Sequence, residues 1–245
     1  MRLFIQITFI TFLSIVIPFS YTNANANEKL TSQQQEALND IHTLLSNNPD
    51  HIVDIQQSLQ QFFGNLHGQQ EAAYRWLFES NTSPILGDPA AERSIIVFTD
   101  YDCPYCKRLE PVLEQLVDEY PGIQVRYILT PLRQTLVQGT QTNSALYAQG
   151  VWLNDESSFK AVHDMLMSTS GLHNQQSLAA VARATGTPQL LENNPEISAT
   201  IEQNLSVFTA LGLRGTPAIL IDNQIIPGLV PYEQLQQIVE EWQSE

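Results

Sequence analysis

The only two cysteines of the chain stand close together, in the run Cys103-Pro104-Tyr105-Cys106. Two intervening residues let both sulfurs meet in a small ring on one helical turn, so the pair can cycle between dithiol and disulfide. As a structural bridge it would contribute little, because the entropic stabilisation grows with the length of the closed loop. Structural zinc needs four ligands, and no second Cys-x-x-Cys or His-x-x-x-His supplies the other two. The pair therefore predicts redox chemistry.

The flanking segments predict a strand before the dithiol and a helix after it. Residues 94–99 are apolar and rich in β-branched side chains, as in a strand buried on both faces, and residues 107–120 have helical apolar spacing. Cys103 then lies at a helix N-terminus, where free backbone N–H groups and the helix dipole favour a thiolate. We expect Cys103 to be the nucleophile and Cys106 to resolve or complete the exchange.

Beyond this helix the sequence predicts one more strand, a helical block and a final β-β-α unit. The strand covers residues 123–129, and about 137–211 show helical spacing without a strand pattern. A hairpin follows over residues 216–226, and the last helix covers 232–242. The expected fold class is α/β, with residues 81–245 as one domain.

This arrangement resembles the thioredoxin superfamily. Its Cys-x-x-Cys follows a buried strand and opens a long helix, and Gly215-Thr216-Pro217 leads into a strand 114 residues after the nucleophile. The longer phrase Phe-Thr-Asp-Tyr-Asp-Cys-Pro-Tyr-Cys-Lys, from Phe98, is similar to the DsbA-like branch of bacterial envelope oxidoreductases, over about residues 84–245.

The resemblance implies a thioredoxin-like fold with an inserted helical block. It also implies that Pro217 is a cis-proline facing the dithiol and that the backbone of Thr216 pairs with a bound peptide. The implied substrate-binding residues are Pro104, Tyr105, Thr216 and Pro217. Tyr105 stands where strong oxidants of the family have histidine, so an extreme reduction potential is not expected.

One position departs from the family pattern. Val97 lies six residues before the nucleophile, where many members have a buried acid that assists proton transfer. The acids nearest in sequence, Asp100 and Asp102, would oppose thiolate formation by like charge if they lay beside the sulfur. We expect them, with Lys107 and Arg108, to be solvated at the surface.

Residues 27–80 differ in composition from the rest, being rich in Gln and Asn and helical in spacing throughout. A first helix begins near Thr31 with a capping-box pattern, and Asn48-Pro49 separates it from a second. The apolar residues of the second helix are spaced as in a short coiled-coil seam, at Ile52, Ile55, Leu59, Phe62 and Leu66. We therefore expect an oligomerisation module. The alternative is that this face packs on the catalytic domain.

The N-terminus reads as a secretory signal peptide. Arg2 precedes an apolar run of about 17 residues, shorter than the roughly 20 that span a bilayer, and cleavage is expected after about Ala26, giving residues 1–26 as the leader. Cleavage removes one basic residue and no acid, so the formal charge of −15 becomes −16. With 26 acidic against 10 basic residues, such a chain would repel phosphate backbones, so nucleic-acid binding is not expected. The expected location is the periplasm.

The Pro-Tyr dipeptide and the helical module are most similar to the ScsC group, suppressors of copper sensitivity whose members can self-associate and isomerise disulfides. This implies a homo-oligomer acting on unfolded or misdisulfided exported proteins, kept reduced by a DsbD-like membrane partner. A DsbA-like dithiol oxidase with a DsbB-like partner stays open, as does Cu(I) binding by the two soft thiolates. No cofactor besides the redox-active pair and no metal site is predicted, because the five histidines are scattered.

Overall fold

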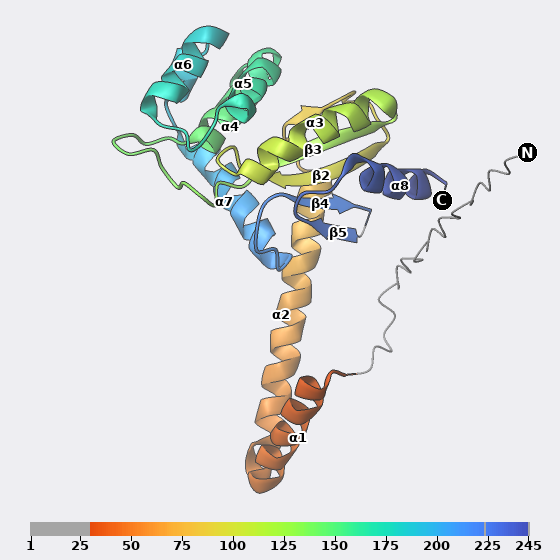
Figure 1. Cartoon of the computed structure of the whole chain (residues 1–245). Coiled ribbons are helices and arrows are strands. Elements are labelled where there is room, and N and C mark those ends of the chain that lie inside the picture. Colours follow the sequence, from red (N-terminus) through yellow and green to blue (C-terminus); the bar gives the residue numbers. More distant parts are fainter. Residues whose placement is uncertain (1–29, 223, 245) are drawn as a thin grey trace, which may run out of the picture. The chain divides into compact units, whose positions relative to one another are not determined.

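The computed structural model describes residues 30–222 and 224–244, so the predicted signal peptide lies outside the described residues. The described residues divide into two compact units, one up to Leu59 and one from Gln60 onward, and Figure 1 colours them along the sequence. No helix of the described part is both long and apolar enough to cross a membrane.

The described part of the first unit contains α1 (Ser32–Asn47), the 3-10 turn η1 (Pro49–His51) and the start of α2 (Ile52–Glu79). The capping box predicted for α1 is present: Thr31 Oγ1 accepts from the Gln34 N–H, and Gln34 Oε1 accepts from the Thr31 N–H. None of the residues of α1 is buried. The two predicted helices are therefore confirmed, and α1 leaves its apolar side chains uncovered within this chain.

The second unit is built on a five-stranded mixed sheet with the order β1-β3-β2-β4-β5. Strands β2 and β3 are parallel, in a register that pairs Arg93 with Ile123, and the other neighbours are antiparallel. The strands are β1 (Ile85–Leu86), β2 (Arg93–Thr99), β3 (Ile123–Leu129), β4 (Ala218–Ile221) and β5 (Gln224–Pro227). The two-residue β1 was not predicted, because it is too short to show periodicity.

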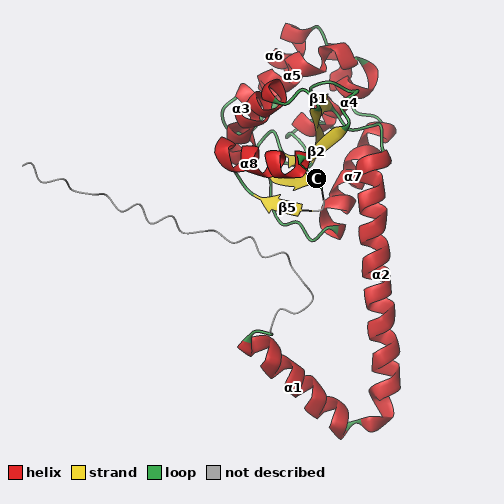
Figure 2. Cartoon of the chain, turned by 90° about the vertical axis from the view of Figure 1, so that its right-hand side faces the viewer, coloured by secondary structure: helices red, strands yellow, loops and turns green. Residues whose placement is uncertain are grey.

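Helices surround this sheet, as Figure 2 shows by the red ribbons around the yellow strands. The crossover between β2 and β3 is α3 (Pro104–Glu119), and the chain ends in α8 (Tyr232–Gln243). The predicted helical block lies between β3 and β4. It consists of α4 (Ser144–Asn154), α5 (Glu156–Ser168), α6 (Gln175–Thr185), η2 (Pro188–Leu191) and α7 (Pro195–Ala210).

Alternate side chains of β2 pack into two hydrophobic cores on opposite faces of the sheet. Val97 belongs to the core with α3, α8 and the helical block, whereas Phe98 packs with α7 and with Ala73 and Leu77 of α2. The end of α2 is thus part of the second unit, which begins at Gln60, before the predicted boundary at residue 80. The assignment of residues 27–80 as an oligomerisation module stays a prediction.

Candidate active site

The dithiol lies where β2 turns into α3, as the sequence predicts. Cys103 is the N-cap of α3 in an extended conformation, and Pro104 occupies the first helical turn, where a missing N–H costs nothing. The N–H of Cys103 donates to the Asp100 carbonyl at 2.9 Å, and its carbonyl accepts from the Lys107 N–H at 3.2 Å. Both cysteines are free thiols, with 5% of Cys103 and 1% of Cys106 exposed.

The surroundings of the dithiol shift the pKa values of the two cysteines in opposite directions. A hydrogen bond from the Cys106 thiol lowers the pKa of Cys103 from 9.0 to about 5, against the effect of burial. Further hydrogen bonds from the Cys106 backbone, the Thr216 side chain and the Tyr105 backbone act in the same direction. The bond to Cys103 and burial raise the pKa of Cys106 far above 9.0. At neutral pH, Cys103 is therefore the thiol that ionises, as the predicted nucleophile must, and the Cys106 thiol donates the hydrogen bond beside it.

The segment opposite the nucleophile is Thr216-Pro217, which leads directly into β4. Its peptide bond is cis, as the resemblance to the thioredoxin superfamily implies. When protonated, the Cys103 thiol donates to the Thr216 carbonyl oxygen at 3.2 Å, and the Gly228 N–H donates to the Pro217 carbonyl at 2.8 Å. The structure thus brings Cys103 together with two residues that lie 113 and 114 positions further along the chain.

Asp100 is buried, with only 1% exposed, so the expectation that it is a solvated surface residue is wrong. Its Oδ1 accepts from the Asp102 N–H at 2.8 Å, and its Oδ2 accepts from the N–H groups of Leu132 and Arg133 at 3.0 Å. Burial raises the pKa of Asp100, and these bonds partly offset that effect. Its own N–H donates to Cys106 Sγ at 3.4 Å. The carboxylate therefore ties the dithiol loop to the segment after β3.

Asp102 is also buried, with 3% exposed, and the same expectation fails for it. Its Oδ1 accepts from the backbone N–H of His173 at 2.6 Å, and its Oδ2 accepts from the Ser144 hydroxyl at 3.2 Å. Ser144 begins α4, and His173 stands just before α6. The hydrogen bonds of Asp102 thus connect the dithiol loop to the helical block, with donors that lie 42 and 71 residues further along the sequence.

Lys107 is half-buried, and its ammonium group donates to the carbonyls of Thr169 and, at 3.0 Å, Gly171. Burial lowers its pKa. It is therefore a fixed cation rather than the solvated side chain expected from the sequence. Arg108 is exposed as predicted, and its guanidinium carbon lies 5.9 Å from the ring centre of Tyr105. Tyr105 itself is 54% exposed beside the nucleophile.

Sequence reasoning missed a buried polar cluster behind the dithiol. The Tyr101 hydroxyl lies 2.8 Å from His163 Nδ1, and His163 Nε2 lies 3.0 Å from Glu110 Oε1, which also accepts from the Tyr127 hydroxyl. Burial, and secondly the charge of Glu110, raises the pKa of both tyrosines well above 10.0. Glu110 lies one helical turn beyond Cys106, a spacing that could have signalled it. No spacing indicates His163, which comes from α5.

The described residues contain no group of three or more His, Cys, Asp or Glu side chains placed to hold a metal ion. The pair of thiols supports thiol-disulfide exchange through its own atoms.

A family model described as thioredoxin matches residues 79–241. The chain belongs to the thioredoxin family. The matched region begins at Glu79, the last residue of α2, and includes the sheet, the dithiol, the cis-proline and the inserted helices.

Two curated relatives of this thioredoxin-family chain are thiol-disulfide proteins by name. Disulfide bond formation protein D of Bacillus subtilis is 23% identical over 173 residues, covering 64% of this chain and 75% of the relative. Thiol:disulfide interchange protein DsbC of Escherichia coli K12 is 27% identical over 158 residues, covering 64% of this chain. The chain spans about half of the length of DsbC, 54%.

Solved structures support the resemblance to the ScsC group. A linker-deletion mutant of Proteus mirabilis ScsC is 28% identical with a TM-score of 0.67, covering 89% of this chain and 99% of that chain. A periplasmic thioredoxin-like protein from Salmonella enterica serovar Typhimurium is 31% identical with a TM-score of 0.65, covering 71% and 97%. The ScsC-type, DsbA-like resemblance and the fold predicted from it are confirmed.

Proposed function

We propose that this chain is an exported thiol-disulfide oxidoreductase that acts on protein disulfides through Cys103 and Cys106. The observation that carries the proposal is the asymmetric dithiol: the pKa of Cys103 is about 5, and its sulfur lies 3.2 Å from the Thr216 carbonyl, next to cis-Pro217. The exposed side chains of Pro104 and Tyr105 follow the nucleophile in the first turn of α3. A peptide strand that pairs with Thr216 would place its sulfur beside Cys103.

The chemistry follows from the two pKa values. The Cys103 thiolate attacks one sulfur of a client disulfide, the S–S bond breaks, and the other client sulfur leaves as a thiolate and takes up a proton. Cys106 then gives up its proton and attacks Cys103, releasing the second client thiolate and leaving the chain oxidised by two electrons. In isomerisation, a client thiolate attacks the mixed disulfide instead, and the dithiol is recovered unchanged. The redox group is the cysteine pair itself.

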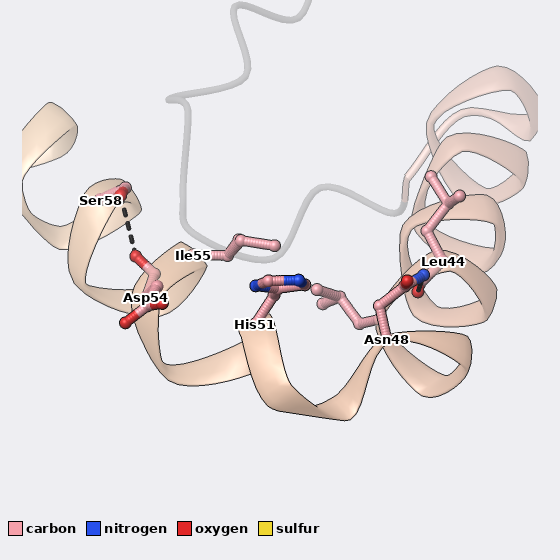
Figure 3. A pocket seen from close by; sticks show the side chains of 7 residues that line it. Leu44, Asn48, His51, Asp54, Ile55 and Ser58 are labelled. Carbon is pink, nitrogen blue, oxygen red and sulfur yellow. Dashed lines mark hydrogen bonds between the residues drawn. The ribbon is translucent and has the colours of Figure 1, made fainter.

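The same proposal includes self-association through the N-terminal helices, which favours an isomerase or reductase over an oxidase. The apolar side chains of α1 are exposed, with 50% of Leu38, 50% of Ile41 and 64% of Leu44 accessible. An open groove of about 320 Å³ lies between the end of α1 and the start of α2, and Figure 3 shows Leu44 and Ile55 among its lining residues. Exposed apolar surface of this kind is typical of helices that pack on a partner.

An isomerase of this kind would work in the periplasm on misdisulfided exported proteins, with a DsbD-like membrane protein keeping its dithiol reduced. Two or more dithiols in one assembly raise the effective concentration of the second site at a bound client. The rival function is a DsbA-like oxidase, which rests in the disulfide form and needs a DsbB-like oxidant. The dithiol is common to both functions, and only the proposed self-association favours the isomerase, so an experiment must separate them.

The test is reactivation of a scrambled multi-disulfide protein in a glutathione buffer by the mature chain. The perturbation is the double substitution Leu38→Glu with Leu44→Glu, which places charge on the exposed apolar side chains of α1. The control is Gln33→Glu with Asn39→Asp, at two exposed polar positions of the same helix. Both variants gain two negative charges, so a difference between them reports the loss of apolar surface.

The molar mass of each variant is measured by light scattering beside the assay. We expect the leucine variant to become monomeric and to lose reactivation while it still reacts with a small disulfide, and the control to behave as the wild type. Rapid oxidation of a reduced dithiol peptide by all forms, without reactivation, would establish the oxidase instead.

A further inference from the structure

The segments that surround the nucleophile are unlike the rest of this acidic chain. Hydrogen bonds bring three segments to the first turns of α3: residues 131–137 through Asp100, 169–173 through Lys107 and Asp102, and 212–217 through Cys103. Together with residues 103–109 they contain four cations and no acid, in a chain with 26 acidic and 11 basic residues. The cations are Lys107, Arg108, Arg133 and Arg214.

These cations make no salt bridge to a carboxylate, although the charges of the buried Asp102 and Asp100 act on Lys107. Among the described residues, salt bridges to carboxylates are made only by Lys160 and His163. Arg108, Arg133 and Arg214 are exposed. The two acids of the dithiol loop lie beneath this surface, at most 3% exposed, and their oxygens accept from backbone N–H and hydroxyl donors. The outward-facing charge around the nucleophile is therefore positive.

A small cavity of about 150 Å³, large enough for one side chain, is lined on this surface by the residues on either side of Cys103. Its walls combine apolar atoms with two of the cations, and the lining residues are Asp102, Pro104, Lys107, Arg133, Gly171 and Leu172. Leucine side chains around it are exposed, with 42% of Leu132 and 50% of Leu172 accessible. The surface thus offers an apolar contact and a positive charge side by side.

We propose that this surface selects client segments that have an acidic residue next to the disulfide-bonded cysteine, with that acid beside Lys107 and Arg133. The inference rests on the proposed function and adds the substrate class. Charge complementarity favours such clients: a chain of net charge −15 repels acidic proteins, whereas the cations near Cys103 make the local charge positive where the two sulfurs must meet. The cavity beside Pro104 takes a neighbouring apolar side chain of the client.

The test uses the full mature chain with Cys106→Ser, so that the reaction stops at the mixed disulfide. The probes are three peptides, each dimerised through its single cysteine and differing only in the next residue, which is Glu, Gln or Lys. The Cys103 thiolate breaks the peptide S–S bond and forms a new one, and the released peptide thiolate takes up a proton. Mass spectrometry of quenched samples gives the rate constant.

We expect the Glu peptide to react about tenfold faster than the Lys peptide at low ionic strength. The difference should shrink to about twofold in 0.5 M salt, where charges are screened beyond about 4 Å. Arg133→Gln should reduce the preference about threefold, because it removes one exposed cation but keeps the backbone N–H that Asp100 binds. Arg183→Gln, an equal charge change in the last turn of α6, should leave the preference unchanged.

Equal rates for the three peptides at low salt would overturn the inference and point to another partner for the cations, such as an acidic domain of a redox protein. The same loss of preference in the Arg133 and Arg183 variants would also overturn it, because the effect would then come from net charge alone. If no peptide forms a mixed disulfide with Cys103, the proposed function fails, and the inference fails with it.

Discussion

The stability of the reduced chain should depend on pH through Cys103. The perturbation is a change from pH 5 to pH 7, and the cause is the Cys106 hydrogen bond that lowers the pKa of Cys103 from 9.0 to about 5. A lowered pKa stabilises the folded state fully above the unfolded value, and this stabilisation is lost as the pH falls through the folded value. The disulfide form has no ionisable sulfur, so it serves as the internal reference.

The magnitude follows from the two pKa values. A thiol of pKa 5 in the folded and 9 in the unfolded state stabilises the fold by up to about 2.7 kcal/mol at pH 7 and about 0.4 kcal/mol at pH 5. Cys106 adds no pH dependence in this range, because its thiol is protonated below about pH 8 in both states: its pKa is raised in the folded state and has the ordinary value of 9.0 in the unfolded state. The free energy of unfolding of the reduced form should therefore rise by about 1–2 kcal/mol from pH 5 to pH 7, relative to that of the oxidised form. This is less than the full difference, because solvent screens part of the effect.

The assay is urea unfolding of the reduced and oxidised chain at both pH values, followed by circular dichroism. Subtracting the oxidised from the reduced free energy of unfolding removes the contributions of carboxylates common to both forms. A Cys103→Ser variant should lose the pH-dependent gain, since its hydroxyl does not ionise in this range. A difference between the two forms that stays constant from pH 5 to pH 7 would refute the thiolate assignment.

Three further predictions concern the scaffold, and urea unfolding measures each. Gly87→Ala should destabilise the fold by about 2 kcal/mol, because Gly87 has a φ of +96° and an added Cβ would lie 2.6 Å from a valine methyl. The control is Gly68→Ala, which has open space around it and should be neutral or stabilising. Equal effects of the two substitutions on the free energy of unfolding would contradict this prediction. His163→Phe should cost about 3 kcal/mol, because the buried Tyr101 hydroxyl loses its partner and Glu110 keeps only the Tyr127 hydroxyl beside it. Adding Glu110→Leu should restore part of that loss. A double variant less stable than the single one would count against the pairing of His163 with Glu110. Asp102→Ala should cost about 2–4 kcal/mol, because a buried backbone N–H and a hydroxyl lose their acceptor; wild-type stability would exclude this role.

The elements that position the dithiol could be predicted from the sequence, because their patterns are local. The strand predicted over residues 94–99 corresponds to β2, and the strand predicted over 123–129 has the bounds of β3. The helix after the dithiol, the hairpin of β4 and β5 and the final helix likewise follow from apolar spacing and turn residues. The cis bond before Pro217 was predicted from the resemblance alone, since most X-Pro bonds are trans.

The buried polar contacts around the dithiol could not be predicted in this way. Asp100 and Asp102 are adjacent to the dithiol in sequence and polar, which favours a surface position, but their hydrogen-bond donors come from segments up to 71 residues away. The burial of Leu77 depends likewise on a contact of α2 with the sheet that no local pattern shows. Such long-range pairing of polar groups and helix faces is a property of the assembled fold.

Trapping of clients by the Cys106→Ser variant tests most directly whether Cys103 exchanges disulfides with proteins. The reduced variant is mixed with a scrambled disulfide protein, quenched with acid and analysed by mass spectrometry, with Cys103→Ser as the control. We expect a covalent adduct that forms through Cys103, is released by dithiothreitol and is absent in the control. No adduct, together with tight Cu(I) binding by the wild-type dithiol, would contradict the account and establish the pair as a metal site.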